Sequence, residues 1–278
     1  MTAPPRADCI ADSAGGLSFD IADAGRPGAV GSWDAALLLR LRGGQDGAAD
    51  DELRLPLVPA ADGRLRAALP STVALPEGRW DAYVADAGGE AERLMPGLND
   101  LRSLVDRRPD TGRGSVAVRI PYTTKHGNLS VRSWLRGPHA EAAEIHVLDG
   151  SVAVHGRLYG AQAGPEAVAE ARSRRDPAAV RTVPVTADGS QFSFTLFYQE
   201  LAGFWEGGQE TWDLWLRPAR GAGAVRVARI LDDVADKKPI FHYPAQPLSP
   251  PHGQARIGPY YTQDNDLSVR MGEPAGRS

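Results

Sequence analysis

The sequence predicts an all-β protein made of two tandem immunoglobulin-like β-sandwich domains that arose by internal duplication. The first observation is a repeated element. Residues 121–124 (Pro-Tyr-Thr-Thr) and 129–132 (Leu-Ser-Val-Arg) are matched, with the same spacing, by 259–262 (Pro-Tyr-Tyr-Thr) and 267–270 (Leu-Ser-Val-Arg). The second is hydrophobic patterning, because short apolar or alternating runs stand between Gly, Pro and Asp residues, as in strands joined by turns. A chain of 278 residues is also long enough for two domains.

Internal similarity extends beyond that element. A Val-Pro pair, an Asp-Gly turn and a Trp-Asp strand recur in the same order in both halves. The matching pieces are Val58-Pro59 and Val183-Pro184, Asp62-Gly63 and Asp188-Gly189, and Trp80-Asp81 and Trp212-Asp213. Similarity at so long a period indicates that each half is one folding unit that was copied.

The expected strands follow from the pattern of each segment in turn. In the first half they are 36–42, 53–58, 65–69, 80–85 and 115–122. In the second half they are 145–148, 152–158, 179–185, 191–197, 211–216, 225–230 and 255–261. Helical character is confined to 165–175, which opens on a proline and is rich in Ala, Glu and Arg, with weaker signals at 96–106 and 231–237.

The repeated element also predicts the domain boundaries. Leu17-Ser18 matches its second half, so the element is expected to close one unit and to open the next. The predicted organisation is a disordered leader (1–16), a first sandwich (17–124), a bridge (125–128), a second sandwich with an aromatic insertion (129–262) and a C-terminal tail (263–278). The strand in this tail either pairs within the second sandwich or adds to the sheet edge of another chain, which is a route to self-association.

Composition and charge exclude several classes of protein. With 42% apolar and 24% charged residues and a formal net charge of −4, the chain is ordinary for a globular protein and offers no basic surface for nucleic acid. No stretch has the length of a membrane span and no secretory leader is recognisable, so the expected location is the cytoplasm. The single cysteine, Cys9, is expected to be a thiol in the disordered leader, and the fold needs no disulfide.

Catalytic and cofactor motifs are missing from the sequence. It has no Gly-x-Ser-x-Gly elbow, phosphate-binding loop, His-Glu-x-x-His or Cys-x-x-Cys, so no catalytic residue, cofactor or metal ligand is assigned. Two metal alternatives stay open: His146 and His155 with Asp149 on one hairpin, and calcium on the Asp264-Asn265-Asp266 turn. The favoured interpretations are a surface hairpin and an Asx turn.

The repeated motifs resemble those of β-sandwich modules that accompany actinobacterial glycosyltransferases and polyol-phosphate transferases of the teichoic-acid type. The motifs concerned are Pro-Tyr-x-Thr, Leu-Ser-Val-Arg, Asp-Gly and Trp-Asp, and they occur in both halves. The resemblance implies an accessory role that faces a polymer or a partner protein. Because no nucleotide-sugar domain is recognisable, transferase activity is not carried over to any residue of this chain.

The two copies differ most between the Asp-Gly turn and the Trp-Asp strand, where the second copy has an aromatic, acidic insertion. The predicted ligand-binding residues are Tyr198, Glu200, Phe204, Trp205 and Glu206. Aromatic rings cover the apolar face of a sugar, while carboxylates bond its hydroxyls. The same composition suits a protein interface, and a third interpretation is that the rings fold back onto their own sheet.

We therefore expect a non-catalytic carbohydrate- or protein-binding module, an accessory or scaffold linked to cell-wall or exopolysaccharide glycosyl transfer. The expected partners are a saccharide, a wall polymer or another protein. The alternative is a carbohydrate-active enzyme, a transferase or glycosidase, in which carboxylates near the aromatic loop act as acid and base. These carboxylates are Glu200, Glu206, Glu210 and Asp213.

Overall fold

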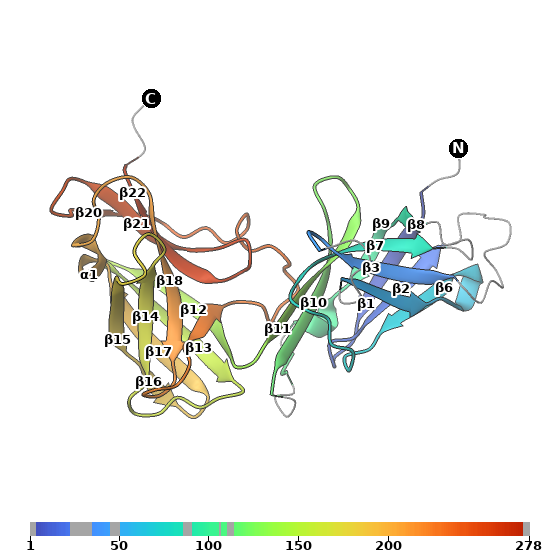
Figure 1. The fold of residues 1–278 in the computed structure, drawn as a ribbon, viewed down its shortest axis with the longest axis horizontal. Helices are drawn as coiled ribbons and strands as arrows, with labels where there is room; N and C mark the ends of the chain where they lie inside the picture. The colour runs from blue at the N-terminus through green and yellow to red at the C-terminus, as the bar shows by residue number, and fades with distance from the viewer. Residues whose placement is uncertain are drawn as a thin grey trace. The chain divides into compact units, whose positions relative to one another are not determined.

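The computed structural model describes residues 4–22, 35–44, 51–85, 91–105, 107–109 and 114–274. These residues lie mostly in strands and turns, which confirms the predicted all-β class, and they form two compact units (Figure 1). Unit 1 takes the described residues of Met1–Asp110, Ala117–Arg136 and Leu231–Ala235, and unit 2 those of Thr111–Val116, Gly137–Ile230 and Asp236–Ser278. Within the described ranges, no helix has the length and apolar character needed to cross a membrane.

Unit 1 consists of two sheets. The strands of the first sheet are β1 (Arg6–Ala11), β2 (Leu17–Ala22), β5 (Val58–Pro59), β6 (Leu65–Leu69) and β9 (Met95–Asp100), in the order β5-β6-β2-β1-β9. The strands of the second sheet are β3 (Ala36–Leu41), β4 (Glu52–Pro56), β7 (Gly78–Ala85), β8 (Ala91–Arg93), β10 (Val116–Thr123) and β11 (Leu129–Arg136). Their order is β10-β11-β7-β3-β4, with β8 beside β7.

Unit 2 is one connected sheet that folds into two layers. One layer has the order β16-β17-β13-β12, with β12 (His139–Leu148), β13 (Ser151–Tyr159), β16 (Thr186–Asp188) and β17 (Gln191–Phe197). The other contains β14 (Val168–Ser173), β15 (Val180–Pro184), β18 (Glu210–Arg217), β20 (Gln246–Leu248), β21 (Ala255–Tyr261) and β22 (Leu267–Gly272). One α-helix, α1 (Gln199–Ala202), is described, and it lies between β17 and β18.

The strand β19 (Val225–Ala228) joins the two layers of unit 2. It pairs in parallel with β12 and antiparallel with β18. The inner faces of both layers then share one buried core, to which β13 and β17 contribute Val154 and Phe194, and β18 contributes Trp212 and Leu214. Because side chains alternate between the faces of a strand, the other face of β13 and β17 is left to solvent.

All the strands expected from the hydrophobic pattern are present, and three of them have the predicted bounds, namely β6, β17 and β21. The helix expected over 165–175 is wrong, because this segment contains strand β14, which pairs with both β15 and β18. Ala169 and Ala171 are buried here, so the strand period is present but is carried by alanine, a strong helix former. The two weaker helix signals also fail, since 96–106 contains most of β9 and a 3₁₀ turn, and 231–237 is irregular.

The predicted disordered leader contains a strand. β1 pairs with β2 and β9, and Cys9 lies opposite Phe19 with its side chain buried. Burial raises the pKa of the Cys9 thiol to about 12, so this is an unreactive core group rather than a tail thiol. The leader was missed because the inward residues of β1 are Ala7, Cys9 and Ala11, which are small and give a weak hydrophobic pattern.

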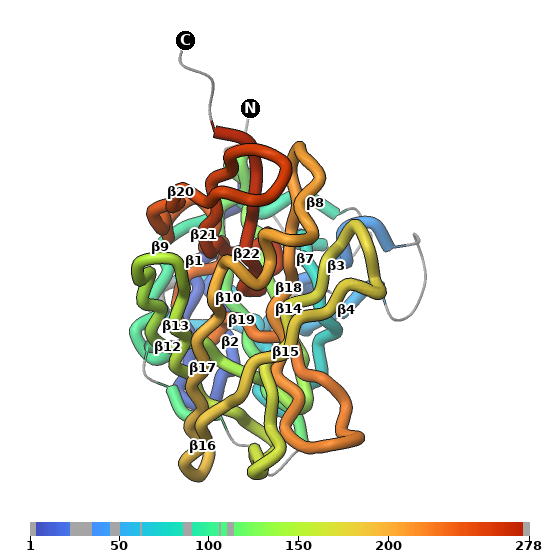
Figure 2. The backbone as a smooth tube through the Cα atoms, turned by 90° about the vertical axis from the view of Figure 1, so that its left-hand side faces the viewer, coloured from blue at the N-terminus to red at the C-terminus, as the bar shows by residue number. Residues whose placement is uncertain are grey.

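The structure places the boundary between the units one strand later than predicted. β11 pairs with β7 and closes unit 1. β22 pairs with β18 and β21 and closes unit 2 (Figure 2). β22 is therefore an interior strand of its sheet, which leaves no open edge on it for strand addition to another chain. Leu17-Ser18 belongs to β2, which pairs with β1 and β6 rather than with a Trp-Asp strand.

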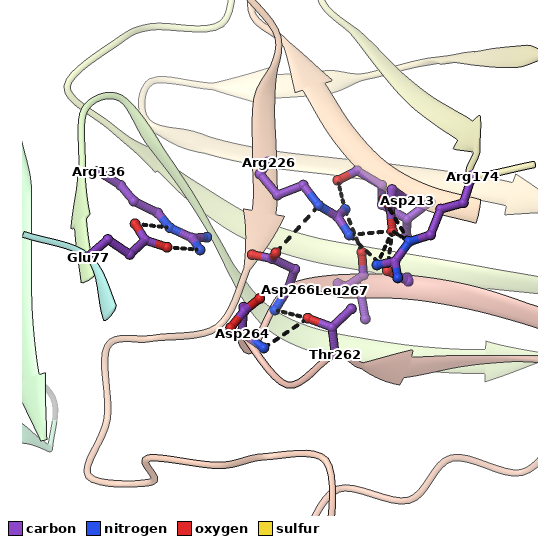
Figure 3. A network of polar contacts seen from close by, with 11 residues as sticks. Glu77, Arg136, Arg174, Asp213, Arg226, Thr262, Asp264, Asp266 and Leu267 are labelled. Atoms are coloured by element: carbon purple, nitrogen blue, oxygen red, sulfur yellow. Dashed lines mark hydrogen bonds and ion pairs between the residues drawn. The ribbon is translucent and has the colours of Figure 1, made fainter. Parts of the chain in front are cut away.

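A partly buried polar cluster explains this pairing in unit 2. The Asp213 carboxylate on β18 accepts a hydrogen bond from the Ser268 hydroxyl on β22 at 2.8 Å, and it contacts Arg174 at 2.9 Å and Arg226 at 2.7 Å (Figure 3). Arg226 also donates to the backbone carbonyl of Leu267. The Leu-Ser-Val-Arg strand is thereby bonded to the Trp-Asp strand through side chains as well as through the backbone ladder.

The same cluster occurs in unit 1. Asp81 on β7 accepts a hydrogen bond from Ser130 on β11 at 2.7 Å and contacts Arg42 at 2.5 Å and Arg93 at 2.9 Å. Arg93 also donates to the carbonyl of Leu129. The recurrence of Trp-Asp and Leu-Ser-Val-Arg in the sequence thus has a structural cause, since each pair of motifs supplies one such cluster.

Candidate functional site

The aromatic insertion of the second copy packs into the core of unit 2. Tyr198 is buried at the start of α1, and Trp205 is 3% exposed after its end. Phe204 is half-buried, with its ring against Trp212 at 5.5 Å between centroids. Of the five predicted ligand-binding residues, only Glu200 and Glu206 are exposed to solvent.

Polar contacts hold this insertion in place. The Arg175 guanidinium donates to the carbonyl of Phe204 at 3.1 Å and to the Glu210 carboxylate at 3.0 Å. The Trp205 indole donates to the carbonyl of Gly208, and the Arg181 guanidinium lies 4.2 Å from the centre of the Phe204 ring. The rings of Tyr198 and Trp205 are therefore buried and present no face to a ligand. For these two residues, the third interpretation applies, in which the rings fold back onto their own sheet.

Two of the four carboxylates considered for catalysis are held in ion pairs. Glu210 is buried and bonded to Arg175 and Ser173, and its burial raises its pKa. Burial also acts to raise the pKa of Asp213, but the hydrogen bond from Arg174, the charge of Arg226 and the hydrogen bond from Ser268 together hold that pKa below its ordinary range. Both carboxylates are therefore engaged by arginines of unit 2.

The predicted hairpin of His146 and His155 is confirmed as β12 and β13. The two rings meet edge to face at 5.5 Å between centroids, and the side-chain partner of His146 is Glu144, at 3.2 Å, rather than Asp149. Throughout the described ranges, no three His, Cys, Asp or Glu side chains gather in a way that could hold a metal ion. The metal alternative on this hairpin is therefore not supported.

The Asp264-Asn265-Asp266 turn uses its polar groups within the protein. The Thr262 hydroxyl accepts hydrogen bonds from the backbone N–H groups of Asp264 and Asp266 (Figure 3), and the Asn265 amide oxygen accepts one from the N–H of Lys237. Asn265 adopts a φ of +61°, the left-handed conformation that Asn tolerates. This is the local bonding that favours Asx residues in turns.

We expect calcium to have no effect on stability. Asp266 lies 3.7 Å from Arg226 and the Asn265 oxygen is already bonded, so the turn has no converging set of free oxygen ligands. The melting temperature should be the same in millimolar calcium and in excess chelator. A rise of several degrees with calcium, reversed by chelator, would contradict this expectation.

The solvent face of unit 2 lies on the layer β16-β17-β13-β12. Side chains that are directly opposite on neighbouring strands share a face, and the pairing aligns them in four rows that we call the ladder face. Row 1 is Arg157, Gln191 and Asp188; row 2 is Glu144, His155, Ser193 and Thr186; row 3 is His146, Ala153 and Thr195; row 4 is Leu148, Ser151 and Phe197.

A cavity of about 370 Å³ lies over rows 1 and 2. A β-bulge in β12 between Ala142 and Glu144 faces Gly156, and both Ala143 and Gly156 line the cavity. A side chain at Gly156 would meet the carbonyl of Glu141 and the Phe192 ring, so this position requires glycine. Bulges often mark functional sites, because the extra residue bends the strand and redirects its side chains.

The side chains that line the cavity are suited to hydrogen bonding. They comprise two carboxylates, one guanidinium, one imidazole, one amide and two hydroxyls, from Glu144, Asp188, Arg157, His155, Gln191, Ser193 and Thr186. Within the described part of the chain, the side chains of Arg157, Asp188, Gln191 and Ser193 make no hydrogen bond or ion pair with the protein. Their bonding capacity is directed to solvent or to a ligand.

The corresponding sheet of unit 1 is closed by ion pairs. On its solvent face Arg64 pairs with Asp8, and Arg66 pairs with Asp20 at 2.5 Å. The hydrogen bond from Arg64 lowers the pKa of Asp8, and that from Arg66 lowers the pKa of Asp20. The two faces therefore differ in chemistry, since these four charged groups of unit 1 pair with one another, while Arg157 and Asp188 of row 1 in unit 2 make no ion pair within the described residues.

Sequence reasoning predicted strands within β12, β13 and β17 but not β16, and it did not identify the outer residues of these strands as a site. The signal was present in residues 191–197 (Gln-Phe-Ser-Phe-Thr-Leu-Phe), whose buried positions are Phe192, Phe194 and Leu196. The outward positions are then polar except for Phe197. An aromatic residue at an outward position of an alternating strand was the available indication.

Comparison with known proteins leaves the family open. No family model matches the chain, and no curated protein matches it. The crystal structure of TarS from S. aureus aligns with 59% of this chain and 28% of its own length, at 13% identity and a TM-score of 0.40. The S. aureus TarS fragment 217–571 aligns with 69% of this chain and 55% of its own length, at 12% identity and a TM-score of 0.32.

A tetra-tandem repeat from the extending region of a large adhesion protein aligns with 98% of this chain and all of its own length, at 11% identity and a TM-score of 0.22. This chain thus spans 28% and 55% of the two TarS chains. Similarities this low do not carry an inference about function, which has to come from the site itself.

Proposed function

We propose that this chain is a non-catalytic binding module that holds an uncharged saccharide on the ladder face of unit 2. The observation that carries the proposal is the cavity over rows 1 and 2, where the hydrogen-bonding side chains of Arg157, Asp188, Gln191 and Ser193 are not used by the described part of the protein. Binding sites of this kind combine a preformed concave shape with a few polar groups that fix the orientation of the ligand.

The composition of the cavity favours a polyhydroxylated ligand. The lining offers both donors and acceptors, as the hydroxyl groups of a sugar require. Glu144 and Asp188 stand against one guanidinium, that of Arg157, so the cavity has no excess of positive charge with which to attract phosphate or carboxylate groups. A neutral saccharide therefore fits the site better than an anionic one.

The proposed context is accessory and linked to wall or exopolysaccharide glycosyl transfer. The sequence resemblance to sandwich modules that accompany such transferases supports it, and the ion pairs that hold Glu210 and Asp213 favour binding over turnover. A protein partner is the second expectation from the sequence.

We also propose that the two units are immunoglobulin-like sandwiches that descend from one ancestor. One support is the strand order, which is β10-β11-β7-β3-β4 in unit 1 and β21-β22-β18-β14-β15 in unit 2. The other is the repeated Asp-Ser-Arg-Arg cluster around Asp81 and Asp213. After duplication, one copy kept a face closed by ion pairs and serves as a scaffold, while the other opened its face to a ligand.

The test is titration calorimetry of the full chain with neutral oligosaccharides, accompanied by analysis of the ligand afterwards. Gln191→Ala is expected to weaken binding at least tenfold, because it removes two or more hydrogen bonds to the ligand from an exposed position. Stability should be unchanged, as at other exposed surface sites.

The matched control is Gln199→Ala, which removes the same exposed amide from α1, beside the aromatic insertion. It should bind like the wild type. Equal binding by the wild type and Gln191→Ala would refute the proposed site. Loss of binding in Gln199→Ala would instead indicate a site at the insertion. A consumed ligand would support an enzyme instead.

A further inference from the structure

The exposed apolar side chains of the ladder face gather in row 4. Phe197 is 55% exposed and Leu148 is 48% exposed, and Ser151, which lies between them in register, is 3% exposed. The two large side chains thus flank and cover a small one, and they form an apolar surface at one end of the face.

This apolar surface is held rigidly. Phe197 lies on β17 opposite Ser151, and β17 is paired with β13 along its whole length, from Gln191 to Phe197. The hairpin turn after Leu148 is pinned by Gln246, whose amide donates to the carbonyl of Leu148 and accepts from the N–H of Gly150 at 2.8 Å. Such preorganisation lowers the entropy cost of binding.

The apolar surface is continuous with the cavity. Row 3, with His146, Ala153 and Thr195, connects rows 1 and 2 with row 4 along the same strands. Rows are two residues apart, or about 6.6–6.8 Å, so the four rows extend over about 20 Å. That length exceeds a monosaccharide and accommodates several sugar rings in sequence.

We propose that the ladder face is a track for a linear, uncharged oligosaccharide, with Phe197 as the stacking platform for a sugar ring beyond the cavity. This inference rests on the proposed function and specifies its ligand as an oligomer. A pyranose has an apolar C–H face and a hydroxyl-bearing edge. The Phe197 ring is complementary to the first, and the polar rows are complementary to the second.

The dimensions favour this ligand over a protein partner. The apolar part of the face consists of two large side chains, Leu148 and Phe197, whereas a stable protein interface buries roughly 800 Å² on each partner around an apolar centre. The remaining rows are polar or small. A narrow polar track with one aromatic ring at its end fits a chain of sugars.

The experiment compares neutral malto-, cello-, xylo- and chito-oligosaccharides, from monosaccharide to hexasaccharide, by calorimetry on the full chain. In the wild type, affinity should rise with ligand length. Phe197→Ala should weaken hexasaccharide binding about tenfold, as expected for loss of an aromatic contact, and leave monosaccharide binding unchanged. Phe197→Tyr should restore the length dependence.

Leu98→Ala, which truncates an exposed apolar residue in unit 1, is the control and should bind like the wild type. If Phe197→Ala keeps the full hexasaccharide affinity, or if wild-type affinity does not depend on length, the track is refuted while the cavity stands. If Gln191→Ala binds every ligand like the wild type, the cavity fails and the proposed function fails with it. Absence of binding to every saccharide overturns both.

Discussion

Replacement of Trp205 by alanine is expected to lower the free energy of unfolding of unit 2 by about 3–5 kcal/mol. Trp205 is 3% exposed and belongs to the core cluster, and its indole donates a hydrogen bond to the carbonyl of Gly208. Truncation leaves a large cavity and an unpaired carbonyl. Urea denaturation, followed by far-ultraviolet circular dichroism, measures the change.

The matched variant is Phe197→Ala, which removes an aromatic ring from an exposed position at the end of β17, next to the insertion. Its stability should stay within about 0.5 kcal/mol of the wild type. Together, the two variants separate the structural ring from the ring proposed to face a ligand. A Trp205→Ala protein as stable as the wild type would contradict the packing described for the insertion.

Replacement of Asp213 by asparagine is expected to cost about 2–4 kcal/mol, because it leaves Arg174 and Arg226 without their shared carboxylate. This expected loss of stability is smaller than that for a fully buried ion pair, because the Asp213 side chain is 20% exposed. Asp81→Asn should cost a similar amount in unit 1, where the same cluster occurs. Asp100→Asn, which breaks the exposed pair with Arg102, is the control and should have no measurable effect.

The same cluster has a consequence for acid stability. The pKa values of Asp81 and Asp213 lie below the ordinary range in the folded state, so these groups contribute stability above the carboxyl's ordinary pKa of about 3.9 and lose it as the pH falls further. Denaturation of the wild type and of Asp213→Asn at several pH values should show a difference that shrinks below about pH 4. A difference that stays constant down to low pH would exclude the carboxylate as its source.

The strands of this protein could be predicted where large apolar residues mark the alternation. Residues 191–197 alternate Phe and Leu with polar residues, and β17 has the bounds expected from that pattern. β1 and β14 carry the same period on alanine, cysteine and serine. These small residues are weak markers of burial, and alanine favours helices. Pairing with neighbouring strands decided the structure of both segments.

The repeated motifs were visible in the sequence, but the sequence did not show whether Leu-Ser-Val-Arg opens a unit or closes it. The register of Leu-Ser-Val-Arg depends on the bond between Ser130 and Asp81, residues that lie 49 positions apart. The candidate site shows a related limit. The aromatic insertion has the composition of a binding loop, yet Tyr198 and Trp205 are buried, and composition alone does not tell which way a ring points.

The most direct test of the central claim is amide chemical-shift mapping of the full chain during titration with a neutral oligosaccharide that binds. We predict that the shifted amides lie on β13, β16 and β17, around His155, Asp188 and Gln191, and that they continue to Phe197 as the ligand lengthens. Shifts confined to α1 and the Phe204 segment, or to strands of unit 1, would contradict the assignment of the ladder face as the binding surface.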